Sequence, residues 1–560
     1  LKFRSNLGLD ARTVQDYEFW SAKTSNRGMG TSYAKNAVDK YTMFTLENML
    51  FYDKTFNDKH TLGVTLLQSI QEDKRESVNV AMENLPADNL KYYDLGSGLV
   101  TNTIGSAMVK WNMASFMGRI NYNYLGRYLL TVSARYDGSS RLADGHKWVL
   151  FPSAALAWRI NEESFMSSTS GWLDNLKLRL GFGKTGNSAV DPYQTKGTLS
   201  LIRYPFDNGG TPTIGYAPNA MANSLLTWET TDQWNLGIDF GVLRGRINGT
   251  IDLYMQNTHD LLLKRQLPVV SGFPDVLSNV GKTRNKGIEV SINSMNINSK
   301  DFQWTTDLML SSNKEEIVEL YNGKNDDIGS KWFIGQPVNV HYDYRKVGIW
   351  QNTESDLAEM AKFAANGTEF APGDIKIQDV NGDYKITDAD KQILGNPRPK
   401  LIASMVNTFN YKGFDLSVFL YASFGAMLYN DIYAVEHCGR NGGVKVDYWT
   451  PNNPTNAYPR PSIDEERPIY ITSTYYEKAD FLRVKTMTLG YTLPKTLTNK
   501  FLVEKLRVYF TAQNPFIFTN YTGIDPEAAK VNSAGNPETN GSGFGTPSVS
   551  SWIFGINLTL

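Results

Sequence analysis

The sequence predicts an all-β protein, an antiparallel transmembrane β-barrel with long extracellular loops, of which about sixteen strands lie in this chain. Three observations support this prediction. Apolar and polar residues alternate along most of the chain, short connections between strands alternate with long ones, and the last strand carries an apolar face that reaches the final residue.

The alternation is clearest in 176–182, 234–240 and 246–256. In 234–240, Trp234, Leu236 and Ile238 share one face, and small or polar residues share the other. A surface strand of a soluble sandwich would show the same pattern. However, about sixteen such strands would need covering layers, and the only helical stretch that the sequence predicts lies near 353–364.

The predicted connections fall into two classes that alternate along the chain. The short class comprises 54–59, 124–127, 161–173, 241–245, 296–300, 411–413 and 492–503. The mostly long class comprises 10–40, 73–110, 136–148, 185–227, 259–282, 314–398, 425–479 and 515–550. Outer-membrane barrels have short periplasmic turns and longer extracellular loops, so the alternation favours a barrel over a sandwich.

Both ends of the chain agree with this interpretation. Trp552, Phe554, Ile556, Leu558 and Leu560 form an apolar face that resembles the terminal strand of outer-membrane barrels, although those more often end in an aromatic residue. This strand would end in the periplasm, which makes every long loop extracellular. The first residues, 1–9, read as a strand without a signal peptide, so we expect the later part of a larger protein.

Composition excludes several classes of protein. The chain has 560 residues with a net charge of -1, and no basic excess is available to neutralise nucleic-acid phosphates. No run of 18 apolar residues predicts a transmembrane helix. Cys438 is the only cysteine, so no internal disulfide is possible. Two GKT sequences, at 183–185 and 281–283, lack the preceding glycine of a phosphate-binding loop.

No catalytic motif is present. The five histidines have no paired metal-ligand spacing, and neither a nucleophile elbow nor a catalytic triad pattern occurs. The sequence therefore predicts that the protein is not an enzyme.

One candidate metal site stands out in the segment DVNGDYKITDAD. Asp379, Asn381, Asp383 and Asp390 match positions 1, 3, 5 and 12 of a calcium loop, with the carbonyl of Lys385 at position 7. The usual glycine at position 6 is replaced by a tyrosine, and position 12 is normally a glutamate. A structural Ca²⁺ that stiffens a long loop is the sharper hypothesis, and an Asx-rich turn that binds nothing is the alternative.

Aromatic and charged residues give weaker hypotheses. Trp332, Trp350, Tyr448 and Trp449, together with Phe333, lie in long loops, where they could stack on a substrate or pack the loops against one another. Arg119, Arg135, Arg179 and Asp239 lie on polar strand faces and are expected to point into the lumen, where a structural role is favoured over substrate contact.

Eight segments in order resemble the SusC/RagA group of TonB-dependent transporters. They are RYDGSSRLADGHKWVLFPSAALAWRI (135–160), LDNLKLRLGFGKTGN (173–187), NVGKTRNKGIEV (279–290), IGQPVNVHYDYRKVGIWQ (334–351), GDIKIQDVNGDYKITDADKQILGNPRPK (373–400), YWTPNNP (448–454), DFLRVKTMTLGYTLPK (480–495) and AQNPFIFTNYTGIDPE (512–527).

The resemblance implies a 22-stranded barrel with a plug domain inside it and a TonB-contacting segment before the plug. Residues 1–560 would be barrel only, because neither the plug nor the TonB segment is recognisable in this sequence. It also implies active import of glycan or peptide fragments across the outer membrane of a Bacteroidetes-type Gram-negative bacterium, with a SusD-like surface lipoprotein as partner. A passive receptor or adhesin barrel and a porin-like diffusion channel are the alternatives.

Overall fold

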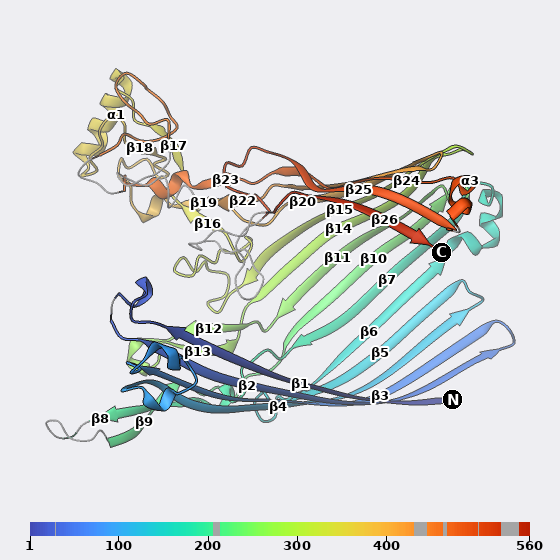
Figure 1. Cartoon of the computed structure of the whole chain (residues 1–560), viewed down its shortest axis with the longest axis horizontal. Helices are drawn as coiled ribbons and strands as arrows, with labels where there is room; N and C mark the ends of the chain where they lie inside the picture. Colours follow the sequence, from blue (N-terminus) through green and yellow to red (C-terminus); the bar gives the residue numbers. More distant parts are fainter. Residues whose placement is uncertain are drawn as a thin grey trace. The chain divides into compact units, whose positions relative to one another are not determined.

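A computed structural model describes residues 1–560 except 29, 205, 207–212, 431–444, 463–466, 502 and 528–547. Its main feature is a 16-stranded sheet whose strands follow one another in sequence order (Figure 1). The strands are β1 (Lys2–Trp20), β2 (Tyr33–Phe56), β3 (His60–Glu83), β4 (Val100–Tyr124), β5 (Tyr128–Ser139), β6 (Trp148–Arg159), β7 (Leu173–Asn187), β10 (Glu229–Val242), β11 (Ile247–His259), β14 (Lys282–Asn298), β15 (Phe302–Glu319), β20 (Leu401–Tyr411), β21 (Phe414–Phe424), β24 (Phe481–Thr492), β25 (Lys505–Thr519) and β26 (Ser551–Thr559).

Neighbouring strands pair antiparallel, as β1 with β2, β20 with β21 and β25 with β26 do. The predicted alternation of short and long connections is present in the structure. The turns 57–59, 125–127, 243–246, 299–301 and 412–413 are short, whereas 188–228, 320–400 and 425–480 are long. The all-β, antiparallel fold class and the number of strands are therefore confirmed.

The long connections carry their own small elements. Two-stranded sheets pair β8 (Thr198–Tyr204) with β9 (Thr213–Ala220), β12 (Leu262–Gln266) with β13 (Asp275–Asn279), β16 (His341–Asp343) with β19 (Gln392–Gly395), β17 (Lys346–Ile349) with β18 (Ile375–Ile377), and β22 (Met427–Tyr429) with β23 (Tyr476–Lys478). The predicted helix is α1 (Glu354–Ala365), which begins after Thr353, whose hydroxyl caps it by accepting from Asp356 N. The short helix α3 (Lys495–Thr498) connects β24 to β25.

Two predicted loops are shorter than expected, because the strands beside them extend further. The loop at 10–40 is only 21–32, and the loop at 73–110 is only 84–99. Polar side chains do not interrupt the backbone hydrogen bonds between strands, so the strands continue through these polar segments. Ion pairs between neighbouring strands stabilise the pairing in these segments. Lys35 Nζ lies 2.5 Å from Asp16 Oδ2, and Arg75 Nη2 lies 3.0 Å from Asp39 Oδ1.

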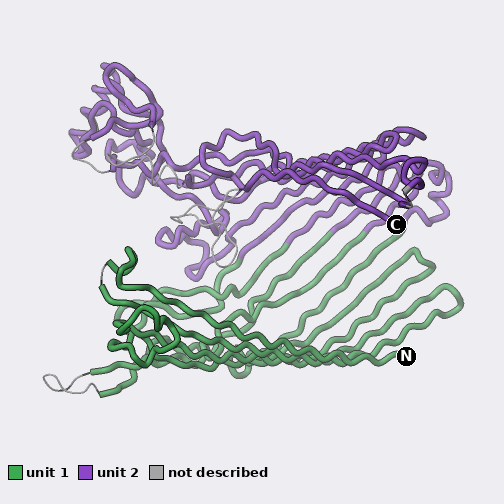
Figure 2. The backbone as a smooth tube through the Cα atoms, in the orientation of Figure 1, with its two compact units in different colours: residues 1–159, 179–235, 256–282 green, residues 160–178, 236–255, 283–560 purple. Residues whose placement is uncertain are grey.

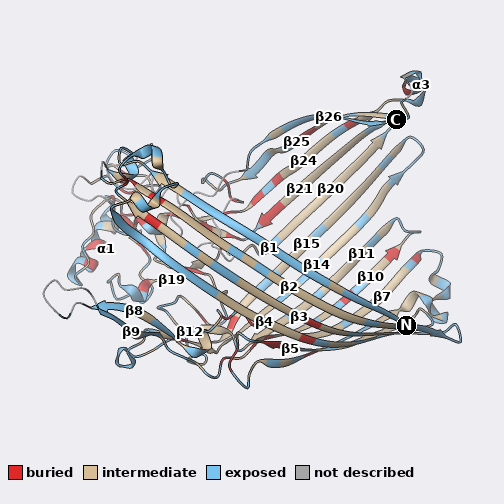
Figure 3. Ribbon diagram, turned by 60° about the horizontal axis from the view of Figure 1, so that its bottom comes forward, coloured by how far each residue is buried: buried red, intermediate tan, exposed pale blue. Residues whose placement is uncertain are grey.

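The strands have one exposed apolar face, as the alternation predicts. Trp234, Leu236 and Ile238 of β10 are exposed, and so are Trp552 and Phe554 of β26. Figure 3 shows that the long strands are mostly intermediate or exposed. Exposed apolar surface of this extent marks an interaction with a partner or a membrane.

The chain forms two compact units (Figure 2). Unit 1 comprises 1–159, 179–235 and 256–282, and unit 2 comprises 160–178, 236–255 and 283–560. Unit 1 has a buried cluster of Leu142, Phe151, Val190, Leu226 and Trp228. In the described part of the chain, no helix has the length and apolar character needed to cross a membrane.

Candidate functional site

The connection 320–400 in unit 2 folds around a small aromatic core. Trp350 is fully buried and packs with Met360 and Phe363 of α1. The rings of Trp350 and Phe363 meet edge to face with centroids 5.8 Å apart. Lys376 Nζ lies 4.1 Å from the centroid of the Trp350 ring, so the ammonium rests on an aromatic face. Helix α1 is thereby fixed against the β17–β18 sheet.

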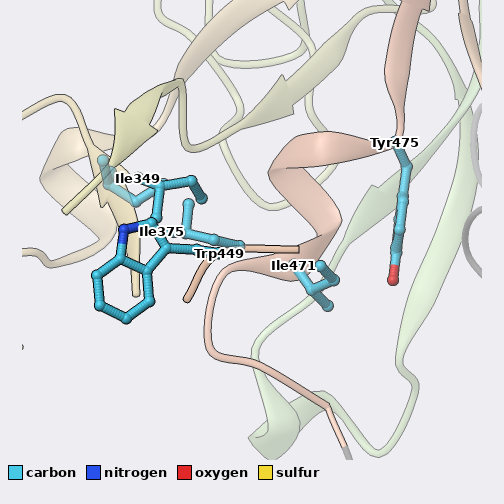
Figure 4. Close-up of a cluster of buried hydrophobic side chains, with 6 residues drawn as sticks. Ile349, Ile375, Trp449, Ile471 and Tyr475 are labelled. Carbon is cyan, nitrogen blue, oxygen red and sulfur yellow. The ribbon is translucent and has the colours of Figure 1, made fainter. Parts of the chain in front are cut away.

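The connection 425–480 packs against the same region. Trp449 lies in a buried cluster with Ile349 and Ile375 of the first connection and Ile471 and Tyr475 of its own (Figure 4). Its indole Nε1 donates to Gln351 Oε1 over 2.9 Å. These contacts join residues about a hundred positions apart, and we call the joined part, 341–400 with 445–462 and 467–480, the loop module.

The aromatic residues proposed to touch substrate divide into two groups. Trp350 is 0% exposed, and Trp449 and Phe333 are also buried, which favours the alternative that they pack the loops, because a buried ring offers no free face. Tyr448 is 45% exposed, and Trp332 is partly buried. Substrate contact by Tyr448 and Trp332 stays a prediction.

The proposed calcium loop adopts a tightly hydrogen-bonded turn. Asp379 accepts from the backbone nitrogens of Gly382 and Tyr384, at 2.7 and 2.8 Å. Asn381 Oδ1 accepts from Asp383 N, and Asp383 Oδ1 accepts from Lys385 N. These are the side-chain-to-backbone bonds of Asx turns.

Asp390 occupies a different setting in the same loop. It is fully buried and accepts from Val380 N and Thr387 N, the second bond forming a capping box. Within the described ranges, no three His, Cys, Asp or Glu side chains are grouped so that they could hold a metal. This geometry favours the turn that binds nothing, and Ca²⁺ binding by Asp379, Asn381, Asp383, Lys385 and Asp390 stays a prediction.

The polar strand residues singled out in the sequence have structural partners. Arg135 Nε donates to Asp137 Oδ1 at 2.7 Å, and its Nη2 donates to Ser115. Asp239 Oδ2 lies 3.5 Å from Lys177 Nζ. These contacts support the structural role expected for Arg135 and Asp239.

A buried ionic cluster was missed at the sequence level. Arg483 on β24 and Asp525 after β25 are both buried and in contact, and Glu527 and Lys485 join them. The sequence carried one signal, a lone arginine between apolar residues in DFLRVK, but nothing in it pointed to an acid about forty positions away.

Electrostatics in the loop module are dominated by burial. Desolvation lowers the pKa of Lys346 to about 8, and its ammonium donates to the carbonyl of Ala457 over 2.7 Å. Burial likewise raises the pKa of Tyr344 to about 12, with nearby Asp388 acting in the same direction. Both shifts follow mainly from burial of these side chains in the loop module.

Comparison with known proteins identifies the family of this chain and several relatives. The family model described as TonB dependent receptor-like, beta-barrel, matches residues 1–514. TonB-dependent receptor P3 of Formosa agariphila is 31% identical over 578 aligned residues, which cover 100% of this chain and 56% of that protein. TonB-dependent receptor SusC of Bacteroides thetaiotaomicron is 35% identical over 434 residues, covering 74% of this chain and 41% of that protein.

Solved structures agree on the fold. The structure of the RagAB peptide transporter matches with a TM-score of 0.82 and 22% identity, over 99% of this chain and 60% of that one. The RagAB peptide importer in its open-open state matches equally well, with a TM-score of 0.82. The chain spans about half the length of the curated relatives that it matches.

Proposed function

This chain belongs to the TonB-dependent receptor-like β-barrel family of the bacterial outer membrane, and on that premise we propose that the protein containing it actively imports nutrients. The cargo class that we propose is glycan or peptide fragments, and the energy comes from TonB through a segment outside these residues. Similarity to SusC over 74% of the chain supports the SusC-like type, and the match to RagAB, a peptide transporter, supports peptides within the cargo class.

The observation that carries this proposal is the folding of the long connections. A simple pore needs only enough residues to join its strands. Here the connections 320–400 and 425–480 build the loop module, with two buried hydrophobic clusters of their own. Ordered loops on a rigid scaffold are where binding residues concentrate, so the module supports capture of a ligand rather than free diffusion.

We propose two partners for the barrel. A plug domain would fill the lumen and contact polar strand residues such as Arg135 and Asp239, because a barrel of this family is too wide to stay closed unaided. A SusD-like surface lipoprotein would cover the loop module from outside. Both partners explain how a wide barrel retains its cargo until TonB acts.

Capture of a ligand from outside the cell requires the loop module to face outward, and labelling of intact cells tests this orientation. A small epitope inserted after Gly367, in the long connection, should be labelled on intact cells, whereas one inserted after Lys412, in the turn between β20 and β21, should not. Labelling only at Lys412 would show that the barrel has the opposite orientation. The loop module would then face the periplasm, which would contradict the proposal.

The partners and the gate are tested on the full-length protein. Purified from its own membrane in mild detergent, it should carry a surface lipoprotein in near-equal amount, seen by mass spectrometry. In a planar bilayer it should conduct little, because the plug fills the lumen. An open, steadily conducting barrel without a lipoprotein would favour the porin-like channel, and a closed barrel that binds ligand but never moves it would favour the passive receptor.

A further inference from the structure

We propose that a cavity in unit 1 binds a small ligand that carries a carboxylate. The idea that this ligand is a transported cargo rests on the import function proposed above, whereas the binding itself does not. The cavity has a volume of about 570 Å³. That size lies within the range of pockets that hold small organic ligands. Its walls come from three places: β4, the β5–β6 connection, and the 188–228 connection.

A step in the sheet creates the cavity. Strand β5 ends at Ser139, opposite Met113, whereas β4 extends back to Val100. The edge of β4 before Met113 is therefore open on that side. Connections replace the missing strand: Ser140 and Asn112 exchange two hydrogen bonds, of 2.8 and 2.9 Å, and the Tyr193 hydroxyl accepts from Lys110 N over 3.2 Å.

Part of the cavity lining is buried in the interior of unit 1. Leu142 and Ala143 line the cavity and are 1% and 3% exposed, and Leu142 belongs to the buried cluster of unit 1. Tyr193 also lines it and has a φ of +70°, which a bulky side chain rarely adopts. Such strain persists only where the surroundings impose it, and it concentrates at ligand sites.

The walls carry an excess of positive charge. Three lysines line the cavity, Lys110, Lys147 and Lys196, against one carboxylate, Asp144. Lys147 pairs with Asp144 at 2.5 Å, and Lys110 pairs with Glu72 at 2.8 Å. Both lysines are about 40% exposed, so their pairs are weak and open to exchange.

Two further cations form no ion pair in the described ranges. Lys196 makes no ion pair there, although its charge acts on the nearby carboxylate of Asp144. The guanidinium of Arg141, next to the lining residues, lies 3.9 Å from the centroid of the Trp111 ring. Its Nε is buried without a hydrogen-bond partner among the described residues, and burial lowers the pKa of this guanidinium. Asp73 and Asp191 interact electrostatically with this guanidinium from outside the lining, whereas the lining itself holds three lysines and one carboxylate.

The remaining lining specifies what the anion is attached to. Trp111 and Tyr193 offer ring surface, and Asn112, Ser140 and Thr195 offer hydrogen-bonding side chains. A carboxylate would lie among the lysines, and a flat, partly polar framework would lie against the rings. A sugar acid and the free end of a short peptide share this chemistry.

Binding is measured on the full-length protein in detergent by calorimetry, separately from transport. The probes are a trigalacturonate, an N-acetylated tripeptide with a free carboxylate, and neutral maltotriose. We expect one of the acidic probes to bind in a way that weakens as salt rises, and maltotriose to bind at least about tenfold more weakly. The acidic probe that binds identifies the source of the carboxylate.

Variants tie the binding to this cavity. Lys196→Gln should weaken the acidic probe about five- to tenfold, Lys196→Glu should abolish its binding, and Lys196→Arg should retain it. Lys23→Gln, a lysine in the connection 21–32 outside the cavity, is the matched control and should change nothing. If Lys196→Arg retains binding, the cavity tolerates substitution at this position, and the weaker binding of Lys196→Gln then reflects the lost charge.

Three results would overturn the proposal: equal binding of maltotriose, unchanged binding in Lys196→Gln, or no saturable binding of either acid up to about 10 mM. The proposed import function fails differently. If the protein binds an acidic probe through Lys196 but cells never take the probe up, the binding site is supported and the import function is contradicted.

Discussion

Arg483 Nη2 lies 2.5 Å from Asp525 Oδ1, and each of the two side chains is only 4% exposed. Arg483 is on strand β24, and Asp525 lies in the connection that follows β25. Asp525 Oδ2 also accepts from Ser548 N over 3.0 Å. Although burial opposes it, bonds from the backbone of Glu527 and Ser548 and from Arg483 hold the pKa of Asp525 below its usual range. The pair joins both described ends of the connection 520–550 to the sheet.

Replacing Asp525 with alanine should release that connection. The variant leaves the buried Arg483 guanidinium without its closest counter-charge, and breaking a buried pair costs about 3–5 kcal/mol. Hydrogen exchange in 515–527 and 548–551 should accelerate, while strands distant from the pair keep their protection. Glu76→Ala is the control, because Glu76 pairs with Lys74 on an exposed surface, where a pair is worth less than about 1 kcal/mol. Equal effects of the two variants would refute the anchoring role.

Trp350 and Tyr448 should respond differently to truncation. Trp350→Ala opens a cavity in the core of the loop module and should cost about 3–5 kcal/mol, seen as rapid proteolysis of 341–400. Tyr448→Ala removes an exposed ring and should leave proteolysis unchanged while it weakens cargo uptake at low concentration. A stable Trp350→Ala protein with impaired uptake would instead restore Trp350 as a substrate contact.

Calcium binding at 379–390 can be separated from a simple turn. If Ca²⁺ is bound, metal analysis finds it at millimolar supply, and a chelator speeds proteolysis of 373–395. The double variant Asp379→Ala with Asp383→Ala should then abolish both the metal and the response to the chelator. Protein without calcium under these conditions would establish the hydrogen-bonded turn, and the double variant would still loosen it through the lost backbone bonds.

Lys346 should make the loop module more stable at alkaline pH. Its pKa is lowered by burial to about 8 from an ordinary value of 10.5, so the unfolded segment binds more protons between these values. Stability must therefore rise with pH across that window. Hydrogen exchange of 341–350 at pH 7.5 and 9.5, corrected for the intrinsic rate, should show increasing protection, and Lys346→Met should remove the trend. If protection of 341–350 in the unmodified protein decreases as pH rises, the proposed effect of Lys346 is contradicted.

The sequence predicted the strands well because one face of each is apolar, as in β10, where Trp234, Leu236 and Ile238 are exposed. It underestimated the lengths of β1 to β4, because polar pairs such as Arg75 with Asp39 continue a ladder without any apolar signal. The burial of Trp350 could not be predicted, since an aromatic residue in a loop has no periodic neighbour that reveals its environment.

Contacts between distant residues were also beyond prediction. Trp449 reaches Gln351, and Arg483 reaches Asp525, only through the pairing of strands that brings their connections together. The resemblance to the SusC/RagA group came from motifs in 135–160 and 373–400, among others, and the family match over residues 1–514 together with the 35% identity to SusC confirms it. Cys438 lies outside the described residues.

Active import can be measured as uptake that depends on TonB. Cells that produce the full-length protein are given a labelled glycan or peptide mixture, and its accumulation is compared with and without a functional TonB. We expect accumulation against a gradient to disappear when TonB is absent, while binding at the cell surface remains. Equal accumulation in both strains, reaching only the outside concentration, would contradict active import and establish a passive channel.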